Sequence, residues 1–342
     1  MPFKAKILLI YTGGTIGMMK DFETGALKAF NFSKLLQRIP ELKQLECEIE
    51  TISFKHPIDS SNINITMWDQ MATMIEENYE IYDGFVILHG SDTMSYSASA
   101  LSFMLENLSK PVIFTGSQLP IGDLRTDAKE NLITAIQIAS LQVKNKPVIQ
   151  EVGLYFEYKL YRGNRTTKIN AEHFNAFTSP NYPALAESGV HLKVEHHLFF
   201  SQKTSKKLIV HKKLDDHVFV LKLFPGLNES VLKSIINIPN LKGIVIETYG
   251  AGNAPTDEWF IKTLEEAVNK GIHIINVTQC SGGSVNMGQY ETSTALKKLG
   301  IISGKDITTE AAITKLMYLL SQNVSHTSFK TIFATSLRGE LS

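Results

Sequence analysis

Cysteine is scarce in this chain of 342 residues, which contains only Cys47 and Cys280. Two cysteines cannot supply a disulfide framework or a zinc site of the cysteine-rich kind. The chain also lacks any apolar run of the roughly 20 residues that span a bilayer. Its start, Met1–Lys4, leads into an apolar segment without the cleavage site of a signal peptide. We therefore expect a cytoplasmic protein with no metal site and no membrane partner.

A surplus of charge of either sign is missing too, because 34 Lys and Arg balance 34 Asp and Glu. One basic cluster, residues 203–213, has no interleaved aromatic side chains and is typical of a solvated face. Nucleic-acid binding is therefore disfavoured on electrostatic grounds. What the chain does have is 43% hydrophobic residues, enough to bury a sizeable core in one or two domains.

Continuous apolar runs alternate with helical patterns along the first half of the chain. Residues 7–11, 84–88 and 112–114 are typical of buried strands. Further strands are expected over 46–54 and 148–158, helices over 66–79, 95–108 and 126–142, and polar loops over 56–62 and 162–168. This alternation predicts βαβ units around a parallel sheet.

The periodicity fades and charges accumulate from about residue 188 to residue 216, and a second series of strands and helices begins at Val218. We therefore predict an α/β protein made of two α/β domains. The larger N-terminal domain, residues 1–190, has a mainly parallel sheet flanked by helices. A hairpin and linker segment, 191–216, leads to a smaller C-terminal α/β domain, 217–342.

Small hydroxyl-bearing and acidic residues gather in the loops that follow four of the expected strands. These loops are residues 12–15, 59–61, 91–93 and 115–118, the last of which contains Ser117. In an open α/β sheet, ligands bind where loops leave the carboxyl ends of the strands. The helix that starts after loop 91–93 would favour an anion or a developing oxyanion at its N-terminus. The loops therefore predict a small-ligand site.

Each member of this set also has a purely structural interpretation. Thr15 and Thr93 could only cap helices, Lys168 could be a surface lysine, and His89 could be a core histidine. The glycines of turn 13–17 fit neither a dinucleotide fingerprint nor a P-loop, and the chain has no Gly-x-Ser-x-Gly elbow. Nicotinamide, ATP and serine-hydrolase sites are therefore not indicated.

Two segments together carry a family resemblance. Residues 11–17, Tyr-Thr-Gly-Gly-Thr-Ile-Gly, and 83–94, which include His-Gly-Ser-Asp-Thr, closely resemble the two signatures of the bacterial-type L-asparaginases. Further matches to the cytoplasmic, type I branch are residues 161–168, 249–255, 286–288 and 337–341. The resemblance covers essentially the whole chain.

The resemblance implies hydrolysis of L-asparagine to L-aspartate and ammonia without a cofactor, through a threonine nucleophile and an acyl-enzyme intermediate. Thr15 matches the nucleophile of the family, and Ser91, Lys168 and Asp92 match its second catalytic group. A threonine hydroxyl is a poor nucleophile until a nearby base activates it. The backbone N–H groups at the Thr15 and Ser91 turns could hold the oxyanion.

The substrate contacts that the resemblance implies lie in the same loops and in the second domain. Asp92 is expected to bind the α-ammonium group and Ser60 the α-carboxylate, with Asp59 and Ser61 beside it. Ser117 in the neighbouring loop is a further candidate. Asn253 would come from the C-terminal domain of a partner subunit, which implies a homodimer or a homotetramer.

Three departures from the family pattern bear on activation and regulation. Ser91 stands where the family usually has threonine, which keeps the hydroxyl but rotates more freely. The flap segment 24–27 has no tyrosine to assist the nucleophile, and Tyr290 is the alternative candidate. Some type I enzymes have an activating asparagine site with an arginine and a cysteine; Cys280 matches, but Glu247 stands in place of the arginine.

Other functions are compatible with the same loops. A related amidohydrolase could prefer L-glutamine or D-asparagine. A catalytically silent amino-acid sensor would keep the loops and release no ammonia. The asparaginase-like subunit of a tRNA-dependent amidotransferase has an extra N-terminal domain, which this sequence does not suggest.

Overall fold

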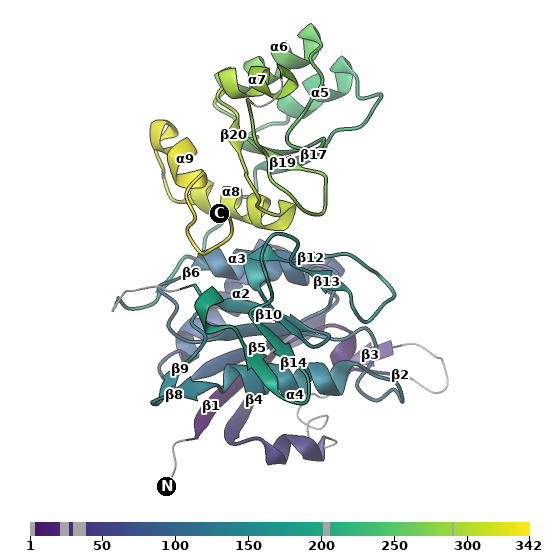
Figure 1. The fold of residues 1–342 in the computed structure, drawn as a ribbon, viewed down its shortest axis with the longest axis vertical. Coiled ribbons are helices and arrows are strands. Elements are labelled where there is room, and N and C mark those ends of the chain that lie inside the picture. The colour runs from purple at the N-terminus through teal and green to yellow at the C-terminus, as the bar shows by residue number, and fades with distance from the viewer. Residues whose placement is uncertain (1–3, 21–26, 30–38, 201–205, 289–290) are drawn as a thin grey trace. The chain divides into compact units, whose positions relative to one another are not determined.

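The computed structural model describes residues 4–20, 27–29, 39–200, 206–288 and 291–342. The chain divides into two compact units, unit 1 (Met1–Lys212) and unit 2 (Lys213–Ser342), each with its own sheet and helices (Figure 1). The prediction of an α/β fold, with a larger, mainly parallel N-terminal sheet and a smaller C-terminal α/β part, is confirmed.

Unit 1 is built on a mixed sheet, ordered β15-β14-β11-β10-β7-β5-β1-β4. Neighbours from β10 to β4 pair in parallel, and β11, β14 and β15 add antiparallel pairs at the other end. The strands are β1 (Ala5–Gly13), β4 (Cys47–Ile58), β5 (Gly84–Leu88), β7 (Val112–Thr115), β10 (Val152–Phe156), β11 (Lys159–Arg162), β14 (Ala186–Ser188) and β15 (Leu192–Val194). Because parallel strands end at the same edge, the predicted loops are brought together there.

Helices cover both faces of this sheet (Figure 1). α4 (Ala128–Ala139) shares a core with Ile7, Leu9 and Tyr11, whereas α3 (Met94–Met104) packs against β7 and β10, with α2 (Ile65–Asn78) beside it. Alternate side chains of a strand point to opposite faces, so a strand covered on both sides must be apolar throughout. This explains the continuous apolar run of β1.

β4 continues through a segment expected to be loop. It extends to Ile58 and includes Pro57, whereas the sequence predicted a strand that ends near residue 54. β4 lies at the edge of the sheet and, among the described strands, pairs only with β1, so Pro57, which lacks an N–H, is tolerated there. The pairing register shifts between Tyr11 and Gly13, which leads the chain into the turn that follows.

Two predicted helices and one predicted strand are shorter than expected. α3 ends at Met104 rather than at residue 108, because β6 (Leu105–Glu106) pairs with β16 (Ile209–Val210) and Asn107 adopts a positive φ of 61°. α4 ends at Ala139 rather than at residue 142. β10 covers five of the eleven residues expected for its strand. For α3 the cause is long-range pairing, which propensity does not report.

Smaller elements complete unit 1. They are the strand pairs β2 (Met18–Lys20) with β3 (Leu27–Ala29), β8 (Gln142–Val143) with β9 (Lys146–Pro147), and β12 (Thr167–Lys168) with β13 (Phe177–Thr178), and the 3-10 turns η1 (Thr15–Gly17), η2 (Pro40–Gln44), η3 (Ser60–Asn62), η4 (Gly163–Arg165) and η5 (His196–Leu198). β15 and β16 fall in the segment 191–216 and pair with strands of unit 1.

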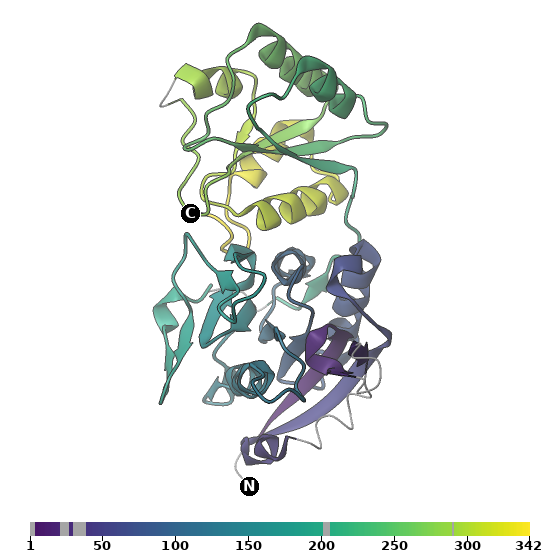
Figure 2. The ribbon, with the colours of Figure 1, turned by 90° about the vertical axis from the view of Figure 1, so that its right-hand side faces the viewer.

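Unit 2 has a parallel sheet ordered β17-β18-β19-β20. Figure 2 shows the green helices α5 and α6 on one side of this sheet and α8 on the other. The elements are β17 (Val218–Lys222), α5 (Glu229–Ile236), β18 (Gly243–Thr248), α6 (Glu258–Asn269), β19 (His273–Thr278), α7 (Glu291–Lys298), β20 (Ile302–Ser303), α8 (Thr309–Ser321) and α9 (His326–Phe333). β17 begins at Val218, where the sequence predicted the start of a second series of strands and helices.

Candidate active site

Two glycine loops meet at the carboxyl edge of the unit 1 sheet. Gly14 has a φ of +82°, and a Cβ atom there would lie 2.5 Å from the backbone nitrogen of Gly90. The Gly14 N–H donates a hydrogen bond to the Ile58 carbonyl at 3.1 Å. Only glycine combines this backbone conformation with such a close approach. Thr15 therefore follows a turn that is packed directly against the His89–Gly90 loop.

A third loop packs against the same place. A methyl group on Gly90 would lie 2.5 Å from the Ser60 Oγ atom, so Ser60 contacts the glycine loop directly. Thr93 donates a hydrogen bond from its hydroxyl to the Ser60 carbonyl at 2.8 Å and makes no side-chain cap to α3. Thr93 therefore occupies the N-cap position of α3, as expected, but its side chain does not cap the helix and instead ties two loops together.

Ser91, Asp92 and Lys168 form one connected group. The Lys168 Nζ atom lies 2.9 Å from Ser91 Oγ and 2.6 Å from Asp92 Oδ1. The Lys168 side chain is 17% exposed, whereas that of Asp92 is 64% exposed. The interpretation of Lys168 as a solvated surface residue therefore does not apply: the lysine reaches from β12 to the loop after β5, and the carboxylate remains open to a solute.

The segment that carries Lys168 is more buried than its polar composition suggested. Arg162, Asn164, Arg165 and Thr166 are at most 4% exposed, although the sequence indicated a polar loop. The Arg162 Nε atom lies 2.6 Å from a carboxylate oxygen of Glu151, which compensates the buried charge. This packing gives Lys168 a fixed base from which to reach the site.

Gln118 is a site residue that the sequence placed in a loop without assigning it a role. Its side-chain nitrogen donates to the carbonyls of His173 and Ala171, at 3.1 and 3.3 Å. Its oxygen is thereby turned toward Ser91, which donates to it at 3.1 Å. An amide oxygen only accepts, so the Ser91 oxygen is left to accept from Lys168. The amide thus determines the direction of the Ser91 hydroxyl.

Asp59 and Ser61 are bonded to each other rather than to the Lys168 group. The Asp59 carboxylate accepts from the backbone N–H and from the hydroxyl of Ser61, both at 2.9 Å. These two hydrogen bonds lower the pKa of Asp59. The turn they close leads into η3, where Ser60 lies against Gly90. The Ser117 hydroxyl donates to the Leu119 carbonyl at 2.6 Å within its own loop.

Candidate residues of unit 2 lie in a separate part of the chain. Asn253 forms a bridge with Tyr249, and its side-chain oxygen accepts from the Thr292 hydroxyl at 2.8 Å. Tyr290 and the flap segment 24–26 lie outside the described residues. Glu247 accepts from the Thr309 hydroxyl at 2.6 Å and lies 3.5 Å from the Lys222 ammonium, so its carboxylate is already paired.

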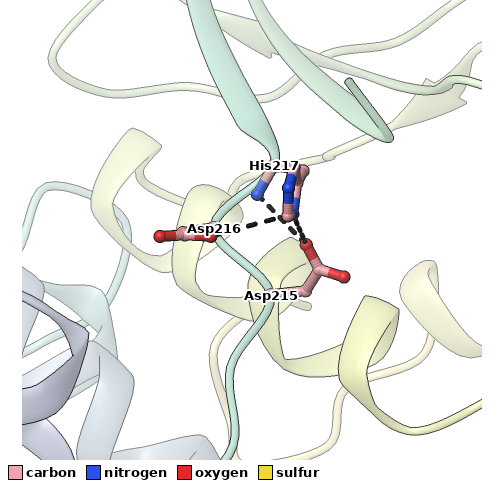
Figure 3. Close-up of side chains that lie close together, drawn as sticks. All are labelled: Asp215, Asp216 and His217. Carbon is pink, nitrogen blue, oxygen red and sulfur yellow. Dashed lines mark hydrogen bonds and ion pairs between the residues drawn. The ribbon is translucent and has the colours of Figure 1, made fainter. Parts of the chain in front are cut away.

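The described ranges contain one cluster of three potential metal ligands, formed by Asp215, Asp216 and His217 (Figure 3). His217 Nδ1 lies 2.8 Å from Asp215 Oδ1. The other Asp215 oxygen, Oδ2, accepts from the Lys242 ammonium at 2.6 Å. A lysine at this distance already supplies the positive charge that a metal ion would bring. The cluster is therefore explained as an ion-paired turn at the start of unit 2.

None of the helices in the described ranges combines the length and the apolar character that crossing a lipid bilayer requires.

These features define a class: a two-unit α/β protein with a hydroxyl–lysine–carboxylate group at the carboxyl edge of a parallel sheet. Family models agree with this division. The model described as Asparaginase, N-terminal, matches residues 6–200, and that of the Glutaminase/Asparaginase C-terminal domain matches residues 217–333. The chain belongs to the asparaginase family.

Individual relatives match over almost the full length. The chain is 43% identical to L-asparaginase 1 of Escherichia coli, over 99% of this chain and 98% of that protein. The crystal structure of L-asparaginase I from Vibrio cholerae superposes with a TM-score of 0.90 at 41% identity, over 99% and 100% of the two chains. The thermostable L-asparaginase of Thermococcus kodakarensis gives a TM-score of 0.89 at 32% identity, over 98% and 99%. The family resemblance in the two glycine-rich signatures is confirmed.

Proposed function

We propose that this protein hydrolyses L-asparagine to L-aspartate and ammonia, with Thr15 as the nucleophile of an acyl-enzyme mechanism. The observation that carries the proposal is the Lys168 ammonium, bonded to Ser91 and Asp92 in the loop that packs against the Gly14–Thr15 turn. The high identity to a protein named L-asparaginase 1 supports the choice of substrate.

In this proposal the Thr15 oxygen attacks the side-chain amide carbon of asparagine, and the C–N bond then breaks. The leaving nitrogen must gain a proton to depart as ammonia. Ser91 is suited to deliver it once its hydroxyl turns from the Gln118 oxygen to the leaving nitrogen, because its oxygen accepts from Lys168, which can replace the proton that Ser91 passes on. The proton released by Thr15 balances the one that ammonia carries away. Water then hydrolyses the Thr15 ester and restores the hydroxyl.

The α-ammonium and α-carboxylate groups of asparagine have suitable partners among the residues of the site. The exposed carboxylate of Asp92 is suited to the α-ammonium group, as a charge-assisted hydrogen bond. No described residue hydrogen-bonds the Ser60 hydroxyl, which leaves it able to donate to the α-carboxylate. Asp59, Ser61 and Ser117 would shape the same pocket. Asn253 and Tyr290 would act on the site of a partner subunit, in a homodimer or homotetramer.

The proposal includes a cytoplasmic location and no cofactor. Cys47 and Cys280 are both free thiols, half-buried and exposed respectively, which suits a reducing compartment. The Lys168 group offers an acid and a hydroxyl for amide hydrolysis without a redox or metal centre.

The direct test is ammonia release from L-asparagine, L-glutamine and D-asparagine by the purified protein. We expect the highest kcat/KM with L-asparagine. A preference for either of the other two amides would identify the related amidohydrolase instead. Calorimetric binding of asparagine without ammonia release would establish an amino-acid sensor. The curve of rate against asparagine concentration also reports whether activation by a second molecule occurs.

A further inference from the structure

A buried chain of hydrogen bonds ends beneath the candidate active site. Trp68 on α2 donates from its indole N–H to the Ser97 hydroxyl at 2.9 Å. Ser97 Oγ lies 2.9 Å from Nε2 of His89, and the other ring nitrogen, Nδ1, lies 2.7 Å from the Gly90 carbonyl. His89 and Ser97 are at most 1% exposed. This series of hydrogen bonds thus connects the core to the glycine loop.

The partners determine the tautomer of His89. A carbonyl oxygen only accepts, so Nδ1 must carry the hydrogen. Burial lowers the pKa of His89 to about 4, which keeps the ring neutral near pH 7 and leaves Nε2 as an acceptor. Ser97 then donates to Nε2 while it accepts from Trp68. Each polar atom in this series of hydrogen bonds therefore acts as a defined donor, acceptor or both.

The direction of the Gly90 carbonyl has a consequence on the other side of the same peptide. In a planar trans peptide the C=O and the following N–H point in opposite directions. Since the Gly90 carbonyl points to the buried ring, the Ser91 N–H points away from it. No residue that the structure describes accepts a hydrogen bond from this N–H. A backbone donor without a partner, beside Ser60 and Lys168, is suited to a developing oxyanion.

We infer that His89 is a positioning residue: as the Nδ1–H tautomer it holds the Gly90 carbonyl, so that the Ser91 N–H is aimed into the site as an oxyanion donor. The inference rests on the proposed function for its kinetic consequence and on the hydrogen-bond geometry for the tautomer. The two parts are tested separately.

The first test uses the unmodified protein. Selective ¹⁵N labelling of histidine, with His89→Asn to assign the signal, reports which ring nitrogen carries the hydrogen. We expect a protonated Nδ1 and an unprotonated Nε2 that do not titrate between about pH 5.5 and 8, because the ring is buried and both nitrogens are bonded. An Nε2–H tautomer or a titrating ring overturns the inference, whatever reaction the protein catalyses.

The second test separates the two ring nitrogens. His89→Asn places an N–H near the position of Nδ1 and loses Nε2, whereas His89→Gln reaches the position of Nε2 and loses the donor to Gly90. Removal of an oxyanion donor costs roughly 10²-fold or more in kcat. We expect His89→Gln to lower kcat about a hundredfold with KM changed less than about threefold, and His89→Asn to retain at least about a tenth of kcat.

Thermal unfolding of both variants shows whether they remain folded. If both fold and lose kcat equally, or if His89→Gln turns over like the wild type, the positioning role is wrong. If His89→Gln does not fold, the positioning role is tested by the tautomer measurement and by the kcat that His89→Asn retains. A wild-type protein that releases no ammonia would refute the proposed function while leaving the tautomer result standing.

Discussion

The Lys168 ammonium group lies 2.6 Å from the Asp92 carboxylate, although the two residues are 76 positions apart in the chain. Lys168 comes from a short strand after β11, and Asp92 from the loop between β5 and α3. The pair joins the two halves of the candidate site, and it forms only when unit 1 is folded.

Replacing Thr15 by valine should abolish turnover. Thr15→Val keeps the shape of the side chain and removes the hydroxyl, so we expect kcat to fall by at least about a thousandfold with little change in thermal stability. Steady-state ammonia release and a melting curve measure both quantities. Thr15→Ser retains a hydroxyl and should keep measurable activity. A Thr15→Val protein with wild-type turnover would exclude Thr15 as the nucleophile.

Lys168→Met should lower kcat by about 10²- to 10⁴-fold, the usual range for loss of a proton-transferring group. Methionine replaces the buried stem of the lysine but cannot donate to Ser91. Lys193→Met is the matched control, because Lys193 also lies 2.6 Å from a carboxylate, that of Glu195, yet its side chain is 74% exposed. The control should turn over normally. Equal losses in the two variants would contradict a specific role for Lys168.

Gly90→Ala should damage the site through a single methyl group. The added carbon would lie 2.5 Å from Ser60 Oγ and must displace that loop, so we expect kcat/KM for asparagine to fall roughly 10²-fold. Gly122→Ala is the control, because a methyl group there has nothing within 4 Å. Steady-state kinetics of the two variants with asparagine measure this loss of kcat/KM. Normal activity of Gly90→Ala would show that the contact between the loops can relax without cost.

Glu340→Gln should destabilise unit 2 strongly. Lys315 and Glu340 are both 0% exposed and paired, and Lys315 also donates to the carbonyls of Phe333 and Thr335 at 2.7 Å. Loss of one partner of a buried ion pair costs about 3–5 kcal/mol, because the other charge is left uncompensated. Urea unfolding measures this cost. Glu258→Gln, in the exposed pair with Lys262, should leave the unfolding curve unchanged.

Acid should destabilise the fold through His89. Its pKa in the folded protein is about 4, below the value of 6.5 for an unperturbed histidine, so the unfolded chain binds the proton more readily. The contribution of neutral His89 to the free energy of unfolding is therefore fully present above about pH 6.5. About 3 kcal/mol of this stability is lost as the pH falls towards 4.

Urea unfolding of the wild type and of His89→Asn across this range isolates the effect. The other histidines titrate alike in both proteins, so the difference in unfolding free energy between them should shrink as the pH falls. A difference that stays constant with pH would show that His89 is not held neutral by burial.

Much of the fold could be predicted because its signal is local. The strands β5, β18 and β19 and the helix α2 follow from apolar runs and helical spacing that short segments carry by themselves. Where a distant strand intervened, prediction failed. α3 stops at Met104 because Leu105 and Glu106 pair with residues more than 100 positions away.

The candidate site was predictable in its residue types but not in its connections. The glycine turn and the loop 91–93 are short motifs, and their place at strand ends follows from the fold class. Gln118 and the burial of Arg165 had no comparable signal, because an amide or a guanidinium group is buried only where distant segments supply its partners.

The sequence by itself determined the alternation of strands and helices, the two-unit α/β architecture and the loops in which the chemistry lies, because hydrophobic periodicity and glycine turns act over a few residues. Only the tertiary structure decided which hydroxyl faces which lysine, that Thr93 bonds to Ser60, and that His89 carries its hydrogen on Nδ1. Those choices depend on hydrogen-bond partners from separate strands, whose directions exist only after the core has packed.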